Sequence, residues 1–264
     1  KYKMNVLECF SGTGSVKKCC DELGWNVISV DIDPESKPTH LCSILDFDYK
    51  QYPKNYFSVC WFSPPCCAYS NLQNSWLGRK RHGEIYTREK MNAEMDEADK
   101  LVLKSLEIRD YFDCEVWFME NPQTGRLKTR DIMRDIPFYD VDYCKYCDWG
   151  YKKRTRIWTN KPDWENRLCH NDCDSVITID RNGEILEDGT FVKANKRSKH
   201  ICNLGKKQTL KHIHINNLGN SKCSQQINLA LAGKDSTKKV KKFHTTLKDR
   251  YRVPPDLIYS LLMD

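Results

Sequence analysis

The stretch WFSPPCCAYS, residues 61–70, ends an apolar run with two prolines that are followed by two cysteines. Proline cannot pair in a central strand and holds φ at about −65°. Pro64 and Pro65 should therefore stop a strand and direct the thiol of Cys66 away from its end. A thiolate is a strong nucleophile, so one interpretation is a catalytic cysteine. The other is a stiff turn beside cysteines that are buried as small hydrophobes, and the stretch alone favours it.

Two further segments carry ionisable side chains at strand ends. In MENP, Glu120 follows an apolar run, where a buried carboxyl group can gain a raised pKa and act as an acid. In KKRTR, Arg154 and Arg156 are two residues apart and share one face of a strand. Two guanidinium groups there could hold an anion or orient Glu120. The alternative for the arginines is a surface strand with a charged outer face.

The segment ECFSGTGSV places Gly12 and Gly14 between a strand and a helix. Glycine allows a tight turn and a close approach to a ligand, at a helix N-terminus whose N–H groups are unpaired. Asp31 ends the next strand about 20 residues later, where an acid can bind ribose hydroxyls. A plain glycine turn and a capping carboxylate would also explain these residues. Together they favour a cofactor that contains a nucleoside.

The elements that must position these residues alternate along the first 160 residues. Apolar runs predict strands over 4–10, 25–34, 57–65, 114–122 and 154–160, and helical spacing predicts helices over 14–24 and 91–112. Such alternation indicates an α/β fold with a mostly parallel sheet and helices on both faces. Ligands of such sheets bind at the carboxyl ends of the strands, where the unusual residues lie.

Composition and charge limit the class of protein. The chain has 264 residues, 39% hydrophobic and 30% charged, enough for one α/β domain and a smaller module. We see no membrane span and no signal peptide, and expect a protein of the cytoplasm or nucleus that is not secreted. Residues 193–264 hold 16 Lys or Arg and 4 Asp or Glu, whereas the whole chain carries +7. This basic segment favours a polyanion partner, although a lysine-rich solvated face would explain it equally well.

In order and spacing, these segments closely resemble the motifs of the DNA (cytosine-5)-methyltransferase family, and the chain resembles its compact viral or phage members. FSGTGS resembles the S-adenosylmethionine loop, VDIDP the second motif, SPPC the Pro-Cys motif and MENP the Glu-Asn-Val motif. KKRTR resembles the Gln-x-Arg-x-Arg motif, with Lys152 where Gln is usual. RYRVPPDLIYSLL is weakly similar to the last motif. The resemblance covers residues 4–160 well and 245–264 weakly.

The resemblance implies a Rossmann-like fold and a division of the chain into three parts. Residues 1–160 would be the catalytic domain that binds S-adenosylmethionine, 161–244 a small basic target-recognition region, and 245–264 a segment that returns to the catalytic domain. The implied reaction is methyl transfer to C5 of cytosine in double-stranded DNA, through a covalent cysteine adduct with a flipped base. A loop over 67–90 would close over the DNA with Arg79, Lys80 and Arg81 on phosphates, unless it is a disordered insertion.

The resemblance also assigns roles residue by residue. Cys66 takes the place of the nucleophile, Glu120 that of the acid that meets N3 of cytosine, and Arg154 and Arg156 those of the motif arginines. The implied cofactor site comprises Phe10, Ser11, Gly12, Thr13, Gly14, Ser15, Asp31, Ile32, Ile44 and Pro65. The family's acid for the adenine amino group falls on Ser43.

Two other functions stay open at this point. A tRNA cytosine-5 methyltransferase shares these motifs and differs in its substrate. A catalytically silent nucleic-acid-binding relative is favoured by Lys152 and Ser43, and disfavoured by the presence of Cys66 and Glu120. The sequence indicates neither the target site nor the oligomeric state.

The remaining cysteines suggest a metal site. Fourteen cysteines in a chain of this type favour thiols, metal ligands or catalysis over disulfides. YCKYC and LCHNDC contain pairs at spacings that suit a tetrahedral zinc ion, and we predict Cys144, Cys169, Cys173 and His200 as its ligands. The alternative is chance proximity in a cysteine-rich chain.

Overall fold

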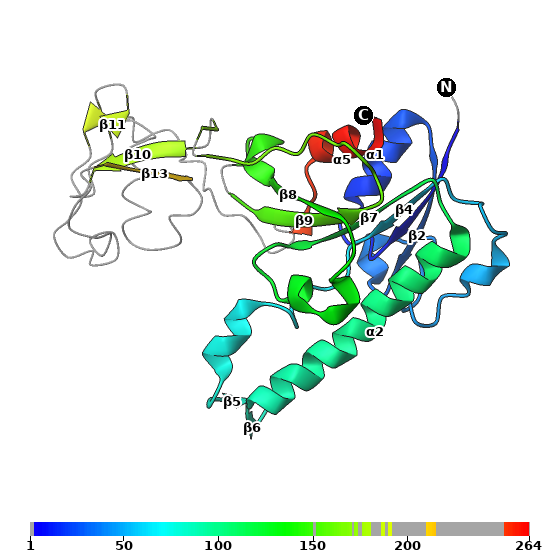
Figure 1. Cartoon of the computed structure of the whole chain (residues 1–264), viewed down its shortest axis with the longest axis horizontal. Helices are drawn as coiled ribbons and strands as arrows, with labels where there is room; N and C mark the ends of the chain where they lie inside the picture. The colour runs from blue at the N-terminus through cyan, green and yellow to red at the C-terminus, as the bar shows by residue number, and fades with distance from the viewer. Residues whose placement is uncertain are drawn as a thin grey trace. The chain divides into compact units, whose positions relative to one another are not determined.

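The computed structural model of the chain describes residues 3–149, 152–170, 172–173, 251–263 and four short strands between 176 and 214. It divides into two compact units (Figure 1). The first comprises Lys1–Asp142, Arg154–Arg167 and Tyr251–Asp264, and the second comprises Tyr143–Lys153 and Leu168–Arg250.

A seven-stranded sheet forms the centre of the first unit, in the order β3-β2-β1-β4-β7-β9-β8. The pairs from β3 to β7 are parallel, and β9 pairs antiparallel with β7 and with β8. The predicted mostly parallel, Rossmann-like sheet is therefore confirmed. The strands are β1 (Asn5–Cys9), β2 (Asn26–Asp31), β3 (His40–Leu41), β4 (Val59–Phe62), β7 (Val116–Pro122), β8 (Phe138–Asp142) and β9 (Arg154–Thr159).

In the part of the chain that the structure describes, three α-helices cover this sheet. Helices α1 (Ser15–Leu23) and α5 (Pro255–Met263) lie on one side and α2 (Arg88–Phe112) on the other (Figure 1). Gly14 and Gly24 adopt left-handed φ values of +64° and +76° at the two ends of α1, as the predicted glycine boundaries require. Helix α2 begins three residues before its predicted start because the Thr87 side chain caps it, accepting the N–H of Lys90.

Between β4 and α2 the chain forms a 3₁₀ helix, η3 (Asn71–Trp76), and a small hairpin of β5 (Lys80–Arg81) and β6 (Glu84–Ile85). The other 3₁₀ helices are η1 (Pro34–Ser36), η2 (Tyr49–Gln51), η4 (Leu127–Thr129), η5 (Asp131–Met133) and η6 (Tyr143–Lys145). In the described part of the chain, no helix combines the length and the apolar character that crossing a membrane requires.

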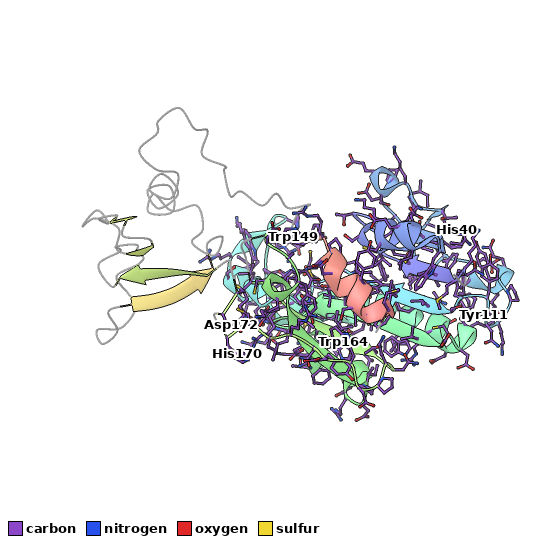
Figure 2. The ribbon with its side chains drawn as sticks, turned by 90° about the horizontal axis from the view of Figure 1, so that it is seen from above. His40, Tyr111, Trp149, Trp164, His170 and Asp172 are labelled. Atoms are coloured by element: carbon purple, nitrogen blue, oxygen red, sulfur yellow. The ribbon has the colours of Figure 1, made fainter. Side chains whose placement is uncertain are left out.

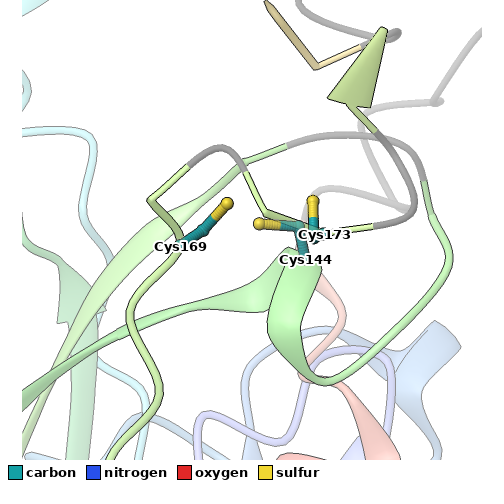
Figure 3. Close-up of side chains that lie close together, drawn as sticks. All are labelled: Cys144, Cys169 and Cys173. Atoms are coloured by element: carbon teal, nitrogen blue, oxygen red, sulfur yellow. The ribbon is translucent and has the colours of Figure 1, made fainter. Parts of the chain in front are cut away.

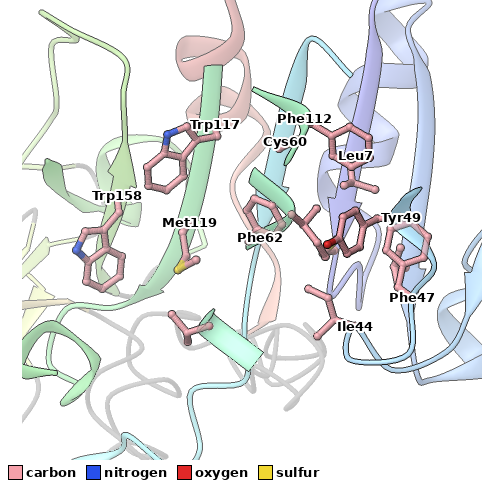
Figure 4. Close-up of a cluster of buried hydrophobic side chains, with 14 of the residues drawn as sticks. Leu7, Ile44, Phe47, Tyr49, Cys60, Phe62, Phe112, Trp117, Met119 and Trp158 are labelled. Atoms are coloured by element: carbon pink, nitrogen blue, oxygen red, sulfur yellow. The ribbon is translucent and has the colours of Figure 1, made fainter. Parts of the chain in front are cut away.

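The hydrophobic core of the first unit lies between the sheet and α2 (Figure 4). Leu7, Cys60, Phe62 and Met119 come from adjacent strands, and Phe112 from the end of α2; all five are fully buried. Large side chains of this kind dominate the free energy of burial. The packing fixes the strands relative to one another, and with them the loops that leave their carboxyl ends.

The C-terminal segment packs on the first unit. Helix α5 lies against α1, and the N–H of Val253 donates to Oγ of Ser15 at 3.2 Å. Trp164 lies beside α5 and donates from Nε1 to Oγ of Ser260 at 3.0 Å (Figure 2). The last residues of the chain therefore reach the turn between β1 and α1.

The second unit is described in part. Strands β10 (Val176–Asp180) and β13 (Leu210–His214) pair antiparallel, as do β11 (Leu186–Glu187) and β12 (Thr190–Phe191). Most of the predicted recognition region and the start of the predicted C-terminal segment lie outside the described residues. The predicted roles of these segments stay predictions.

Candidate active site

Three adjacent parallel strands are in register at one level of the sheet, where β1 and β4 end and β7 continues to Pro122. Phe62 at the end of β4 pairs with Cys9 at the end of β1 and with Met119 of β7. The next residues along the three strands are Phe10, Ser63 and Glu120. The glycine turn and the Pro-Pro-Cys segment therefore leave one edge of the sheet beside the MENP segment at the end of β7, as predicted for a ligand site at the carboxyl ends of strands.

The segment that carries Cys66 is fixed from both sides. Pro64 is buried, and its carbonyl accepts a 2.9 Å hydrogen bond from Nδ2 of Asn121. The N–H of Tyr69 donates to the carbonyl of Cys66 at 3.1 Å, which closes a turn. Cys66 is half-buried, whereas Cys67 is exposed, and neither forms a disulfide. The prolines thus present a partly accessible thiol on a rigid turn.

Tyr69 anchors this turn to α2. Its hydroxyl donates to Oδ1 of Asp99 at 2.8 Å, and Oδ2 of Asp99 accepts from Nε of Arg130 at 2.7 Å. Tyr69 is fully buried and Asp99 nearly so. A buried, charge-assisted network of this kind holds its members in one arrangement.

Glu120 lies in β7 with 7% of its surface exposed. It pairs with Ile157 of β9, whereas Asn121 pairs with Arg156. Opposite residues of an antiparallel pair share a face, so Arg154 and Arg156 belong to the face of the sheet opposite to that of Glu120. The register gives no support to the interpretation in which the arginines orient Glu120 directly.

Both arginines form bidentate ion pairs with β8. Arg154 contacts Asp142 through Nε at 3.0 Å and Nη2 at 2.7 Å, and Arg156 contacts Asp140 at 2.7 and 2.9 Å. The guanidinium of Arg156 also lies 3.4 Å from the ring centroid of Phe138. These contacts hold the β8–β9 hairpin together. Strand β8 was absent from the sequence prediction, so the partners of the arginines could not be foreseen.

The turn between β1 and α1 has the open backbone that a nucleoside cofactor requires. Gly12 and Gly14 have φ of +47° and +64°, and a Cβ atom at Gly14 would meet nothing within 4 Å. The N–H of Gly12 donates to Oδ2 of Asp31 at 2.7 Å, so the acid at the end of β2 lies against this turn. Ser11 is buried, and its Oγ has no hydrogen-bond partner.

Of the other predicted cofactor residues, some are placed where a ligand could reach them and one is covered by the core. Phe10 has φ of +61°, a strained value for an aromatic residue, and Thr13 Oγ1 lies 2.9 Å from Ser15 Oγ. Ile32 is 74% exposed beside Asp31, and Pro65 is exposed as well. Ile44 is buried in the core near Phe47, where the protein itself covers it (Figure 4). An adenine ring could pack on the exposed side chain of Ile32, whereas the side chain of Ile44 is buried and leaves no surface for it.

Buried polar atoms without a partner gather around these strand ends. Among the described residues there are four: Oε2 of Glu8, Oγ of Ser11, Oδ1 of Asn121 and Oγ1 of Thr155. Glu8 and Ser11 lie on and just after β1, Asn121 lies near the end of β7, and Thr155 pairs with Pro122. Buried polar groups are nearly always hydrogen-bonded, so this concentration fits a region that receives a polar ligand. The residues present therefore fit a cofactor such as S-adenosylmethionine.

Glu8 was missed by the sequence analysis. Burial raises the pKa of this carboxyl group from 4.5 to about 8, and hydrogen bonds from the backbone N–H groups of Val16 and Lys17 oppose the shift. Glu8 thereby accepts hydrogen bonds from N–H groups in the first turn of α1, which the N-cap residue Gly14 cannot do because it has no side chain. The available signal was an acid inside the otherwise apolar strand NVLECF.

Tyr251 was missed as well. Burial raises the pKa of this hydroxyl, and the thiols of Cys67 and Cys66 raise it further, so Tyr251 lies close to the nucleophile turn. It belongs to the segment RYRVPPDLIYSLL, whose similarity to the family motif is weak.

The loop after Cys67 is folded into η3 and the β5–β6 hairpin. Nη1 of Arg81 contacts Glu94 at 3.1 Å and donates to Oε1 of Gln73 at 3.0 Å, so this side chain braces the loop. Arg79 and Lys80 are exposed. Two of the three predicted phosphate contacts are thus accessible, and the third has an internal structural role.

Three of the four predicted metal ligands come together in the second unit (Figure 3). The Sγ atoms of Cys144, Cys169 and Cys173 all lie within 4.8 Å of one another. Burial raises the pKa of the Cys144 thiol well above its usual value, and the two neighbouring thiols add to the shift. His200, the fourth predicted ligand, lies outside the described residues.

Comparison with known proteins gives one strong match. The chain is 35% identical over 181 residues to the probable DNA (cytosine-5)-methyltransferase of Frog virus 3 (isolate Goorha). The match spans 68% of this chain and 80% of the viral protein. No protein-family model matches the chain.

The chain is also similar to solved methyltransferase structures, at lower sequence identity. The Entamoeba histolytica methyltransferase EhMeth is 15% identical, with a TM-score of 0.47 over 99% of this chain and 97% of that chain. The S. pombe Dnmt2 methyltransferase is 12% identical, with a TM-score of 0.40 over 64% and 53%. Similarities at this level carry no conclusion about function.

Proposed function

The chain belongs to the DNA (cytosine-5)-methyltransferase family, and we propose that it methylates C5 of cytosine in duplex DNA through a covalent adduct of Cys66. The family resemblance predicted from the motifs is confirmed by the viral relative, and the chain is an S-adenosylmethionine-dependent methyltransferase. The roles of individual residues, the duplex and the flipped base are the proposal.

The observation that carries the proposal is the common edge of β1, β4 and β7. The register places the ends of β1 and β4 beside Met119, the residue before Glu120 in β7, and the hydrogen bond from Asn121 to Pro64 joins the acid segment to the thiol segment. Nucleophile, acid and cofactor turn thus leave adjacent strands. This arrangement places all three groups within reach of one base, which is what the methyl transfer needs.

In the proposed reaction, the Cys66 thiolate adds to C6 of the cytosine. A Cys–C6 bond forms, the ring loses its aromaticity, and the electron pair moves toward C5. Glu120, buried in β7, donates a proton or hydrogen bond to N3 and so stabilises the developing charge. When bound, S-adenosylmethionine supplies an electrophilic methyl group to C5. A base then removes the C5 proton, and the electron pair returns to the ring as the Cys66 thiolate leaves.

The turn between β1 and α1 would hold the cofactor. The backbone of Phe10–Ser15 approaches it closely at Gly12 and Gly14, and Ser11 Oγ offers a hydrogen bond that no protein group takes. Asp31 would bind the ribose hydroxyls and Ile32 the adenine face, while Pro65 borders the site from the nucleophile segment.

Arg154 and Arg156 would act as positioning residues. Their ion pairs with Asp142 and Asp140 brace β9, which is hydrogen-bonded to the strand that carries Glu120. This role differs from direct contact with Glu120.

A cytosine within a duplex is stacked, so its C6 is accessible to a thiolate only after it is flipped out. The basic residues of 193–264 and the exposed Arg79 and Lys80 of the loop would bind the phosphates that flank the flipped base. None of these steps needs zinc. A metal ion at Cys144, Cys169 and Cys173 would be structural.

A methyl-transfer assay with labelled S-adenosylmethionine on duplex DNA, single-stranded DNA and tRNA tests the proposal. We expect transfer to duplex DNA, and a covalent complex with DNA that contains 5-fluorocytosine, because fluorine at C5 cannot leave as a proton does. Peptide mapping should place this complex at Cys66. Transfer to tRNA alone would show the tRNA-methylating alternative, and cofactor and DNA binding with no transfer would show a silent relative.

A further inference from the structure

The three thiols of Cys144, Cys169 and Cys173 form a cluster that methyl transfer does not use. We propose that they bind one structural zinc ion as thiolates. Cys144 lies in η6, two residues after the end of β8, and the other two are four residues apart on one loop. The inference is independent of the proposed reaction, because these residues belong to the second unit and the nucleophile to the first.

The spacing of the sulfur atoms supports a metal rather than a disulfide. A tetrahedral site with Zn–S bonds of about 2.3 Å has sulfur atoms about 3.8 Å apart. The observed separations of at most 4.8 Å need only small side-chain movements to reach this value. A disulfide would join two of the sulfurs at about 2.05 Å and leave the third without a role. None of the three cysteines forms a disulfide.

The surrounding charges suit a thiolate-rich site. Three thiolates around Zn²⁺ leave a net charge of about −1. The ammonium of Lys145 forms an ion pair with Asp172 at 3.1 Å. The ammonium of Lys152 donates to the carbonyl of Cys169 at 2.8 Å. Outer groups of this kind orient the ligands and offset the excess charge.

The ligand set is selective among nearby cysteines. Cys147 is three residues from Cys144, but its Sγ donates to the carbonyl of Tyr143 at the start of η6, at 3.1 Å. The fourth ligand position is left to water or to another side chain. Soft thiolate ligands in a tetrahedral arrangement favour zinc over magnesium or calcium, which prefer oxygen.

The test is elemental analysis of the full chain, purified without added metal, together with cobalt exchange. We expect about one equivalent of zinc and, after exchange, the absorption of tetrahedral Co²⁺ bound to thiolates. Cys169→Ser and Cys173→Ser should each reduce the zinc content at least tenfold. Cys147→Ser is the matched control and should retain the metal. Cys66→Ser should also retain it, which separates this site from the reaction.

Two results would overturn the inference. Less than about a tenth of an equivalent of zinc, with no cobalt–thiolate absorption, would mean that the thiols are ordinary buried cysteines. A thiol titration of the unfolded wild-type chain that finds two thiols fewer before reduction than after it, with peptide mapping that assigns the missing pair to these cysteines, would show a disulfide. Both measurements use the wild-type chain, so they distinguish a zinc site, free thiols and a disulfide even if the variants fail to fold.

Discussion

The two halves of the sheet in the first unit treat polar groups in opposite ways. In the parallel half, the ends of β1 and β7 hold Glu8, Ser11 and Asn121, each with a buried oxygen that has no partner. In the antiparallel β8–β9 hairpin, Arg154 and Arg156 each satisfy a carboxylate with two hydrogen bonds, and the one unpartnered atom among the described residues of the hairpin, Oγ1 of Thr155, lies opposite Pro122 at the end of β7. Unpartnered buried atoms are costly to a fold, and their concentration marks where a ligand belongs. Fully paired charges mark a structural element.

The comparison predicts that substitutions in the parallel half change activity with little effect on stability, and that substitutions in the hairpin do the reverse. The largest effect should come from Cys66→Ser. The hydroxyl is a far weaker nucleophile than a thiolate, so methyl transfer should fall at least about 10³-fold. Binding of S-adenosylmethionine, measured by calorimetry, should be unchanged, because Cys66 lies outside the turn between β1 and α1.

Cys67→Ser is the matched control for this substitution. Cys67 is the more exposed of the two, and methyl transfer should stay within a few-fold of wild type. If Cys67→Ser abolished transfer and Cys66→Ser did not, the assignment of the nucleophile would be wrong.

Glu120→Gln should have the second largest effect. The amide retains the shape of the side chain but cannot give up a proton to N3, so the transfer rate should fall by about 10²-fold or more. The free energy of unfolding should change little. Single-turnover kinetics and urea unfolding on the same preparation measure both. If the free energy of unfolding fell substantially together with the transfer rate, Glu120 would have a structural role, and the proposed difference between the two halves of the sheet would be wrong.

Much of the parallel half could be predicted from sequence because its signals are local. Alternating apolar runs, glycines at the ends of α1 and prolines after β4 each determine the conformation of a few neighbouring residues. Strand β8 has the sequence FYDVD, in which only Val141 and Asp142 are buried, so it lacks a strong strand pattern. Its pairing with β9 is accompanied by ion pairs between the strands, which no local pattern predicts.

The site shows the same limit. Cys66, Glu120 and the glycine turn stand out because proline and glycine lie beside them in sequence. Glu8 and Tyr251 act through contacts with Val16, Lys17 and the cysteine turn, which only the fold brings together. The partners of Arg154 and Arg156, which are Asp142 and Asp140, were not predicted for the same reason. Register, rather than spacing along β9, decides which carboxylates they meet.

Arg154→Ala tests the structural role of the antiparallel β8–β9 hairpin. It would leave the fully buried carboxylate of Asp142 without its bidentate partner, and breaking such a pair should cost about 2–3 kcal/mol of unfolding free energy. Arg134→Ala is the control, because Arg134 and Asp131 form an ion pair that is mostly exposed, and its loss should cost less than about 1 kcal/mol. Urea unfolding at neutral pH compares the two. If both variants lost a similar, small amount of unfolding free energy, the ion pair of the hairpin would contribute no more to stability than an exposed ion pair.

The smallest expected effect concerns Glu8, and its sign depends on the direction of the pKa shift. The pKa of Glu8 is raised to about 8 in the folded protein and has its ordinary value of 4.5 in the unfolded chain. Between these values the folded state keeps a proton that the unfolded chain has lost, so stability falls as pH rises through this window. The slope is on the order of 1 kcal/mol per pH unit, and the loss is complete above about pH 8.

Glu8→Gln removes this titration, so its unfolding free energy should depend less steeply on pH than that of wild type. Other titrating groups contribute to both profiles, and the difference between them isolates Glu8. Denaturant unfolding at pH 6 and pH 8 without cofactor should show wild type losing on the order of 1–2 kcal/mol more than the variant. Parallel profiles would mean that Glu8 is ionised in the folded state, held by the N–H groups of Val16 and Lys17. The parallel half would then satisfy its buried acid as fully as the hairpin does.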